Sequence, residues 1–394
     1  MRKNITIKVF SLAGKFKAIW DNATFQSFEK EINSGLGACS LILGEKFDYQ
    51  GDDCKIGNHI EILISDGDTL NLIEGYRLIY SGYISKISPA IENDEKIQVD
   101  ILGHYTQLGV DLLKSGAYTT LFTDSTAGLT TTGPGDAADL GLVMRAIIER
   151  YRAETLNPVI NYSLGSIPLT ATTALYTLEC KTYREALDKI MSMAPEGYYF
   201  YFDEYNILKF GAKPTTPTHE FIFGKHFQNV RIDRSLEKIR NVLLIWNGET
   251  GAGKVYKEYK DDASILQYGR RAYILKDYGI DDEDGADKIG AKFIAENKDP
   301  DVKVACTIID NNIDSAKGYD IESIQPGDTC VFKGFNEQFA DIFRDNMLIT
   351  KVVYYLDKVE LIIEPKKSSL VEWQNKTNRD LNDFSSFGMP TDYT

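Results

Sequence analysis

The sequence predicts an α+β protein, mostly antiparallel β, in which two small tube-like β-barrel domains flank an α+β domain. Short segments that alternate apolar and polar residues fill the first hundred residues and return after residue 216, as half-buried strands do. Turn-forming residues separate these segments at the short intervals typical of barrels and sandwiches. Between the two β-rich regions, residues 105–215 carry amphipathic helix patterns. We therefore predict domains at 1–104, 105–215 and 216–365, and a polar, mobile tail at 366–394.

The first β-rich region contains at least five strands, and its turns contain Gly, Asn and Asp. One further segment, Phe25–Ile32, has the pattern of either an edge strand or a short helix. The predicted strands are Ile5–Phe10, Ser40–Leu43, Ile60–Ile64, Arg77–Ile87 and Lys96–Leu102. Such a series predicts an antiparallel barrel or sandwich over residues 1–104.

The middle region combines two helices with a hairpin. Residues 119–135 are rich in Thr, Ser and Gly and predict a loop. Apolar residues at helical spacing predict a helix over Asp136–Arg152, which Asp136 or Asp139 can cap. Thr182 and Glu185 fit a capping box that opens a second helix, and Pro195 ends it. The segments Tyr198–Phe202 and Ile207–Phe210 then predict a β-hairpin.

The second β-rich region follows a linker at 213–218 and contains one helix, at Gly285–Asn297, with Ile289, Phe293 and Ile294 on one face. Its predicted strands are His219–Phe223, Asn229–Ser235, Asn241–Trp246, Val255–Tyr259, Lys303–Ile309, Thr329–Phe332, Met347–Tyr355 and Lys358–Ile363. These elements predict a barrel over residues 216–365.

Composition narrows the class of protein. The chain has 394 residues, of which 43% are hydrophobic and 26% charged, and a net charge of −14. So acidic a chain is ill suited to gripping phosphates, although DNA could still slide past its surface. The sequence has no run of about 18 apolar residues, so no membrane span is predicted. The alternating start at Ile5–Phe10 is unlike a signal peptide, and we expect synthesis in a cytoplasm without export by the usual route.

Five cysteines stand at Cys39, Cys54, Cys180, Cys306 and Cys330, and no two of them form a CxxC pair. An odd number of widely spaced cysteines favours reduced, mostly buried thiols. A disulfide framework or a zinc site is the less favoured alternative.

One motif resembles a phosphate-binding loop. Residues 248–254, Gly-Glu-Thr-Gly-Ala-Gly-Lys, follow an apolar strand as that loop does. The next residue is Val255 instead of a magnesium-binding Ser or Thr, and the residues after it alternate like a strand. Without a helix N-terminus the anion cradle is missing, so we interpret the segment as a Gly-rich hairpin.

The remaining polar groups form no recognisable catalytic set. The four histidines, His59, His104, His219 and His226, have no metal-ligand spacing, and no nucleophile elbow is present. The acidic run 281–284 resembles a calcium loop but lacks its ligand order, and we interpret it as the start of the following helix. We therefore predict no catalytic, cofactor-binding or metal-binding residues, no cofactor and no enzymatic activity.

Aromatic residues are concentrated at Tyr198–Phe202, where they alternate on both faces of the predicted strand. A carbohydrate platform uses such residues, but a buried strand or a subunit interface uses them more often. We favour core or interface.

Several segments, in order along residues 1–365, resemble the tail-tip or baseplate hub proteins of long-tailed phages. They are the strands ending in Tyr80–Ile87 and Ile97–Tyr105, the helix and hairpin from Thr182 to Phe210, the pair Asn241–Ile245 and Ser264–Arg271, the Pro-Gly-Asp turn in Ile324–Asp328, and Met347–Val353. Each motif alone is weak, and their order carries the resemblance.

The resemblance implies a structural virion protein at the tail tip, made in the host cytoplasm. It implies a homotrimeric hub whose two barrels per chain close a ring that continues the tail tube and lets genomic DNA pass without stable binding. Implied partners are further copies of the chain, a distal tail protein or the tail tube, the tape measure protein, and receptor-binding or tip fibre proteins. The net charge of −14 suggests an acidic lumen.

Three alternatives stay open at this point. The chain could be the hub of a contractile phage or injection particle, which would share the fold. It could be a carbohydrate- or receptor-binding tail-tip protein, which needs exposed coplanar aromatic rings. It could be an enzyme, which needs polar groups that converge in a pocket.

Overall fold

A computed structural model describes residues 4–20, 23–44, 51–65, 76–91, 95–111, 138–170, 173–174, 182–195, 197–227, 229–237, 239–246, 256–276, 283–310, 318–335 and 346–363. Predictions for the loop at 119–135 and the tail at 366–394 lie outside these residues. Among the described residues, no helix combines the length and the apolar character needed to cross a bilayer.

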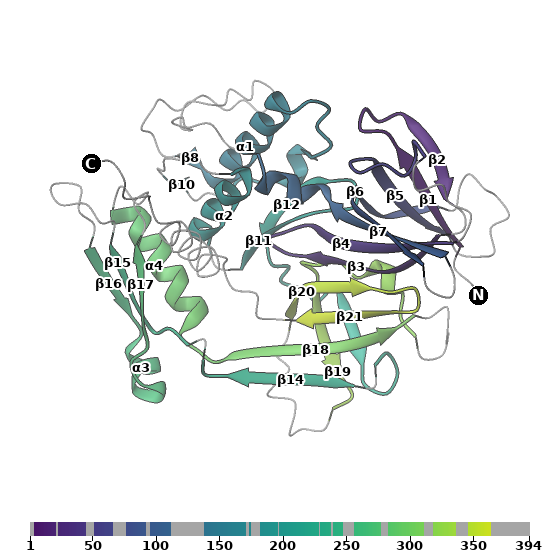
Figure 1. Cartoon of the computed structure of the whole chain (residues 1–394). Helices are drawn as coiled ribbons and strands as arrows, with labels where there is room; N and C mark the ends of the chain where they lie inside the picture. The colour runs from purple at the N-terminus through teal and green to yellow at the C-terminus, as the bar shows by residue number, and fades with distance from the viewer. Residues whose placement is uncertain are drawn as a thin grey trace, which may run out of the picture.

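Strands from both ends of the chain form one large sheet (Figure 1). Its N-terminal members are β1 (Asn4–Phe10), β2 (Phe16–Trp20), β3 (Ala23–Glu31), β4 (Leu36–Leu43), β5 (His59–Ser65), β6 (Arg77–Ile91) and β7 (Glu95–Gly103). Its C-terminal members are β13 (His219–Ile222), β14 (Val230–Ser235), β18 (Asp301–Ile309), β19 (Thr329–Lys333), β20 (Met347–Tyr354) and β21 (Lys358–Ile363). The order is β14-β18-β21-β20-β3-β4-β7-β6-β5-β1-β2, and β19, which carries β13, branches from β20.

The fold class is confirmed as α+β with mostly antiparallel strands, but two separate barrels are not confirmed. In the described part of the chain the sheet stays open, because β14 and β2 are its two ends and do not pair with each other. The strands predicted for the two barrels are joined through the antiparallel pair β3–β20. One hydrophobic cluster includes Phe28, Ile62 and Val99 from the N-terminal strands and Val304, Val352 and Leu361 from the C-terminal strands.

The middle region contains two helices and small sheets. Helix α1 (Leu140–Glu154) begins after Asp139, whose side chain accepts from the Gly141 amide, and α2 (Tyr183–Met193) begins with the predicted Thr182–Glu185 capping box. The hairpin strands β11 (Tyr198–Phe202) and β12 (Ile207–Ala212) pair antiparallel, and β9 (Asn161–Tyr162) lies parallel to β12. A two-stranded sheet joins β8 (Ala138–Asp139) to β10 (Thr173–Ala174), and short 3-10 turns occur at His104–Gly109, Leu164–Ser166 and Ile321–Ser323.

A smaller α/β unit lies at the far side of the molecule from β1 and β2 (Figure 1). It contains β15 (Val242–Trp246), β16 (Tyr256–Lys260), α3 (Asp262–Tyr268), β17 (Ala272–Lys276) and α4 (Glu283–Asn297). Its buried residues Leu243, Leu275 and Phe293 belong to the same hydrophobic cluster as Leu140 of α1 and Leu187 of α2. The described residues thus form two main apolar clusters. The predicted division of the chain at residues 104 and 215 stays a prediction.

Candidate functional site

Strands β3 and β20 form the seam between the N-terminal and C-terminal strands of the large sheet, and several kinds of contact stabilise it. Phe28 of β3 stacks on Tyr354 of β20 with ring centroids 4.7 Å apart and planes 15° apart. Glu29 and Lys351 form an ion pair across the same strands. The Tyr354 hydroxyl donates to the carbonyl of Ile324, which ties the seam to the turn before β19. The seam therefore joins parts of the sheet that lie more than three hundred residues apart in sequence.

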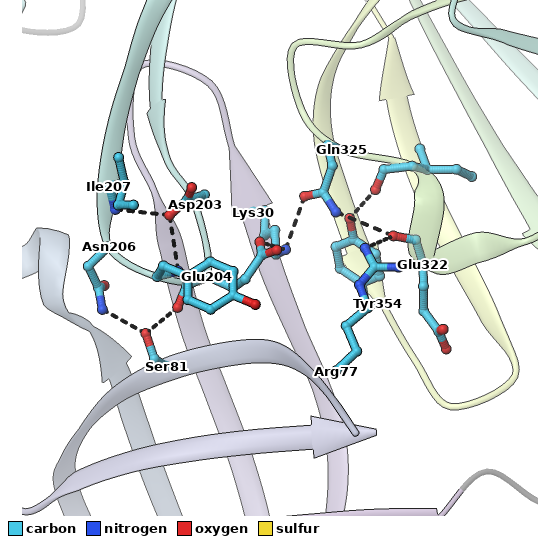
Figure 2. Close-up of polar contacts among 12 residues, drawn as sticks. Lys30, Arg77, Ser81, Asp203, Glu204, Asn206, Ile207, Glu322, Gln325 and Tyr354 are labelled. Atoms are coloured by element: carbon cyan, nitrogen blue, oxygen red, sulfur yellow. Dashed lines mark hydrogen bonds and ion pairs between the residues drawn. The ribbon is translucent and has the colours of Figure 1, made fainter. Parts of the chain in front are cut away.

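A buried lysine marks the point where three parts of the chain meet (Figure 2). Lys30 of β3 is only 2% exposed. Its Nζ lies 3.0 Å from Glu204 Oε2 in the hairpin turn between β11 and β12, and 3.0 Å from Gln325 Oε1 before β19. It also lies 5.3 Å from the centroid of the Tyr354 ring. We call Lys30, Glu204 and Gln325 the three-way junction.

Charge and burial oppose each other at the three-way junction. Burial lowers the pKa of Lys30, and the attraction of Glu204 offsets only part of this effect. At Glu204 burial alone would raise the pKa, but the charge and hydrogen bond of Lys30 outweigh it and hold the pKa below its usual value. Glu204 is thus held ionised, and neither partner can be lost without leaving the other buried without its counter-ion.

The turn that carries Glu204 is fixed by a second set of polar contacts (Figure 2). Ser81 Oγ of β6 donates to the Glu204 carbonyl at 2.7 Å and accepts from Asn206 Nδ2 at 2.7 Å. Asn206 is 3% exposed and has a φ of 58°, a left-handed conformation that asparagine tolerates better than most residues. On the other side, Arg77 Nη2 donates to the Glu322 carbonyl at 2.7 Å.

The junction has no room for a substrate. A cavity of about 20 Å³ lies beside it, lined by Lys30, Arg77, Gln325 and neighbouring apolar residues. This volume suits about one water molecule. The contacts of the three-way junction hold the hairpin β11–β12 against both the N-terminal and the C-terminal strands of the large sheet.

Two histidines that are far apart in the sequence meet on the large sheet. His59 Nδ1 lies 2.7 Å from His104 Nε2, and His59 Nε2 lies 3.5 Å from Glu61 Oε1. Burial, helped by the neighbouring His59, lowers the pKa of His104 to about 3. His104 therefore stays neutral at ordinary pH, and one of the two facing ring nitrogens donates to the other. Sequence spacing missed the pair because the register of β5 and β7 on either side of β6, and not separation along the chain, brings the residue after β7 to the start of β5.

A third polar chain connects Tyr319, His219 and Asp328. His219 Nδ1 lies 3.0 Å from the Tyr319 hydroxyl, and His219 Nε2 lies 3.0 Å from Asp328 Oδ2. The order of groups resembles a catalytic relay, but burial and nearby acidic groups raise the pKa of Tyr319, whereas an activated nucleophile needs a lowered one. Asp328 also accepts from the Gln325 amide, so these polar contacts hold the turn before β19 in place.

The Gly-rich segment, the acidic run and the cysteines that were noted in the sequence can be compared with the described part of the structure. Residues 248–254 lie outside the described residues, but β15 and β16 on either side pair antiparallel, as the hairpin interpretation requires. Helix α4 begins at Glu283, within the acidic run 281–284. Cys39, Cys54, Cys306 and Cys330 are buried and are not in disulfides, and Cys180 lies outside the described residues. The described residues contain no group of three or more side chains suited to hold a metal ion.

The main path of the large sheet ends in two strands that each have one paired edge, and the branch ends in β13, which pairs only with β19 among the described residues. At one end β2 pairs only with β1, and at the other β14 pairs only with β18, within the described part of the chain. Phe16 and Ile19 on β2 are 51% and 48% exposed, and Leu12 in the β1–β2 turn is 75% exposed. An open edge with exposed apolar side chains is a template for pairing with another chain.

No family model and no curated protein matches the sequence. Solved structures do match. The 43 kDa tail protein of prophage MuSo2 from Shewanella oneidensis is 15% identical, with a TM-score of 0.57 over 91% of this chain and 98% of that chain. A tail protein from Neisseria meningitidis is 10% identical, with a TM-score of 0.59 over 94% and 98%. The prophage tail protein gp18 from Listeria monocytogenes is 10% identical, with a TM-score of 0.54 over 96% and 99%. The chain therefore has the fold of phage tail proteins, and the resemblance predicted from its sequence is confirmed at the level of the fold.

Proposed function

We propose that the chain is a structural protein of the phage virion, a homotrimeric hub that closes the distal end of a tail tube and organises the tail tip. The observation that carries the proposal is the single open sheet built from both ends of the chain, with β2 and β14 as its ends. The fold shared with phage tail proteins supports it.

In this proposal the sheet edges close between copies. Three chains related by a threefold axis place β2 of one copy beside β14 of the next, so that each of these two edges gains a partner. The two tube-like barrels expected per chain would then be completed in the assembly. The ring would surround a channel for the passage of genomic DNA, and an acidic lining would keep phosphates from binding.

The proposed partners follow from this position. They are a distal tail protein or the tail tube on one side, and the tape measure protein and receptor-binding or tip fibre proteins at the tip. The three-way junction would keep each subunit rigid, since it locks the middle hairpin to both parts of the sheet.

The test is the oligomeric state of the purified chain and of an edge variant. Ile19→Lys places a charge on the exposed part of β2, and Leu266→Lys places the same charge on α3, where Leu266 is 91% exposed. We expect light scattering to give three times the mass of one chain for the wild type and for Leu266→Lys, and a lower mass for Ile19→Lys. Electron microscopy should show a threefold ring. A wild-type chain that stays monomeric both alone and when mixed with tail tube protein contradicts the proposal.

A second candidate is the hub of a contractile injection particle. A chain of the Francisella PdpA-VgrG complex is 9% identical to this one, with a TM-score of 0.50 over 92% of this chain and 58% of that chain. Both candidates require the same ring. They differ in whether the ring binds a tail tube protein from a contractile or a non-contractile particle, and a pull-down with each tube protein separates them.

A further inference from the structure

A groove lies on the hairpin β11–β12, and the polar contacts described above do not explain it. It has a volume of about 300 Å³, and the residues that shape it are Ser163, Ser166, Tyr199, Tyr201, Lys209 and Gly211. Side chains alternate along a strand, so Phe200 and Phe202 of β11 face the buried cluster while Tyr199 and Tyr201 lie on the opposite face. The groove therefore occupies the face of the hairpin turned away from that cluster.

Two tyrosines give the groove a fixed aromatic surface. The rings of Tyr199 and Tyr201 are nearly parallel, with planes 19° apart and centroids 6.3 Å apart. The Tyr199 hydroxyl donates to the Gly327 carbonyl at 2.9 Å, which holds its ring in place. Burial and the nearby Asp328 raise the pKa of Tyr199 to about 12, and burial also raises the pKa of Tyr201. Both hydroxyls stay protonated at neutral pH.

The neighbouring strand leaves space and adds a cation. Gly211 lies opposite Tyr199 in the register, and a Cβ atom at Gly211 would meet no atom within 4 Å. Lys209 lies opposite Tyr201, and its Nζ is 3.3 Å from Asp203 Oδ2. Ser163 and Ser166 face these residues from the 3-10 turn after β9, where their hydroxyls form reciprocal hydrogen bonds with the backbone. The groove thus combines aromatic surface, hydroxyls and one ammonium group.

We propose that this groove binds a saccharide. The rings of Tyr199 and Tyr201 match the apolar C–H faces of sugar rings, and the serine hydroxyls and Lys209 can bond sugar hydroxyls. A phosphate-rich ligand would need several cations, and Lys209 is the only cationic side chain among the residues that line the groove. A lipid would need an apolar groove, and this one is lined by hydroxyl and ammonium groups. The inference goes beyond the hub function and does not depend on trimer formation.

The experiment measures binding of three tetrasaccharides, made of N-acetylglucosamine, glucose or galacturonic acid, to the full-length protein by calorimetry. Gly211→Phe fills the groove from its open position. Tyr201→Ala removes one ring, and Tyr205→Ala is the matched control, because Tyr205 lies in the turn of the same hairpin, is 58% exposed and does not shape the groove. Melting temperatures verify that each variant folds.

We expect at least one tetrasaccharide to bind the wild type and Tyr205→Ala equally. Gly211→Phe should abolish that binding, and Tyr201→Ala should weaken it by about tenfold, the loss expected for one aromatic contact. A preference for the galacturonic acid probe would indicate that Lys209 binds the sugar carboxylate. A preference for a neutral probe would indicate that Lys209 binds sugar hydroxyls. The proposal is wrong if none of the three binds in the millimolar range, or if Gly211→Phe binds as the wild type does. It is equally wrong if Gly211→Phe lowers the oligomer mass while no tetrasaccharide binds, since the groove is then covered by a second copy.

Discussion

At the scale of single residues, the pair Lys30–Glu204 has a large expected effect on stability. Glu204→Gln keeps the shape of the side chain but leaves the Lys30 ammonium, 2% exposed, without a counter-ion. We expect the free energy of unfolding to fall by about 3–5 kcal/mol. Urea denaturation at neutral pH measures it. The matched control is Glu258→Gln, which breaks an exposed pair with Arg270 and should cost less than about 1 kcal/mol. Equal losses in the two variants would contradict the role of the three-way junction.

The same pair makes stability depend on pH in the acid range. The pKa of Glu204 in the folded chain is below its usual value, so its contribution is complete above the pKa of an unfolded glutamate. The contribution is lost as pH falls through the lower, folded pKa. We expect the stability difference between the wild type and Glu204→Gln to be constant near neutral pH and to shrink below about pH 4. Denaturation curves at a series of pH values measure this difference. A difference that grows on acidification would reverse the assigned sign.

The three-way junction shows what a sequence can and cannot reveal about a site. Lys30 and Glu204 are 174 residues apart, and Lys30 and Gln325 are 295 apart. In the sequence Lys30 is an ordinary polar residue in an alternating strand. Its burial follows from the pairing of β3 with β20, which no local pattern specifies. The histidine pair was missed for the same reason, because cross-strand register decides which side chains meet.

At the scale of elements, the capping box of α2 links a sequence motif to a measurable energy. Thr182 Oγ1 accepts from the Glu185 amide at 3.2 Å, and Glu185 Oε2 accepts from the Thr182 amide at 3.0 Å. Thr182→Ala removes one of these bonds, and we expect a loss of about 1 kcal/mol, measured by thermal unfolding. Thr182→Ser keeps the hydroxyl and should retain most of the stability. A Ser variant as unstable as the Ala variant would show that the methyl group, and not the cap, matters.

Elements with strong periodicity were predicted, and those without it were missed. Helix α1 has a stripe of buried apolar residues, and strand β1 alternates clearly, so both were found. Helix α3 has only seven residues, and Ser264 alone is buried, so no apolar stripe marks it even though Asp261 caps it. Strand β2 was missed because it is an edge strand whose apolar residues Phe16 and Ile19 are half exposed. The segment Phe25–Ile32 has the pattern of either an edge strand or a short helix, and all of it except Ile32 lies in β3. Strand β3 joins the two parts of the sheet.

At the scale of the whole molecule, sequence order and spatial organisation diverge. Residues 242–297 stand between strands of the large sheet in sequence, yet their buried side chains pack with α1 and α2. Lys292 of α4 donates to the Met191 carbonyl at the end of α2, which ties the inserted unit to the middle region. Periodicity in the sequence identifies the buried face of α4. It does not identify the surface against which this face packs, because tertiary contacts decide that.

The joined sheet predicts that the two ends of the chain unfold together. Trp20 lies in the same hydrophobic cluster as Val352 of β20, and both are almost fully buried. In a background with Trp246→Phe and Trp373→Phe, Trp20 is the only tryptophan left, and its fluorescence reports on the N-terminal strands. Val352→Ala creates a cavity in the C-terminal strands and should lower the urea midpoint reported by Trp20, by an amount equivalent to about 2 kcal/mol. Leu275→Ala, a larger truncation in the other cluster, should still shift that midpoint less. If two separate barrels exist, Val352→Ala leaves the Trp20 transition unchanged, because the cavity then lies in a unit that unfolds independently.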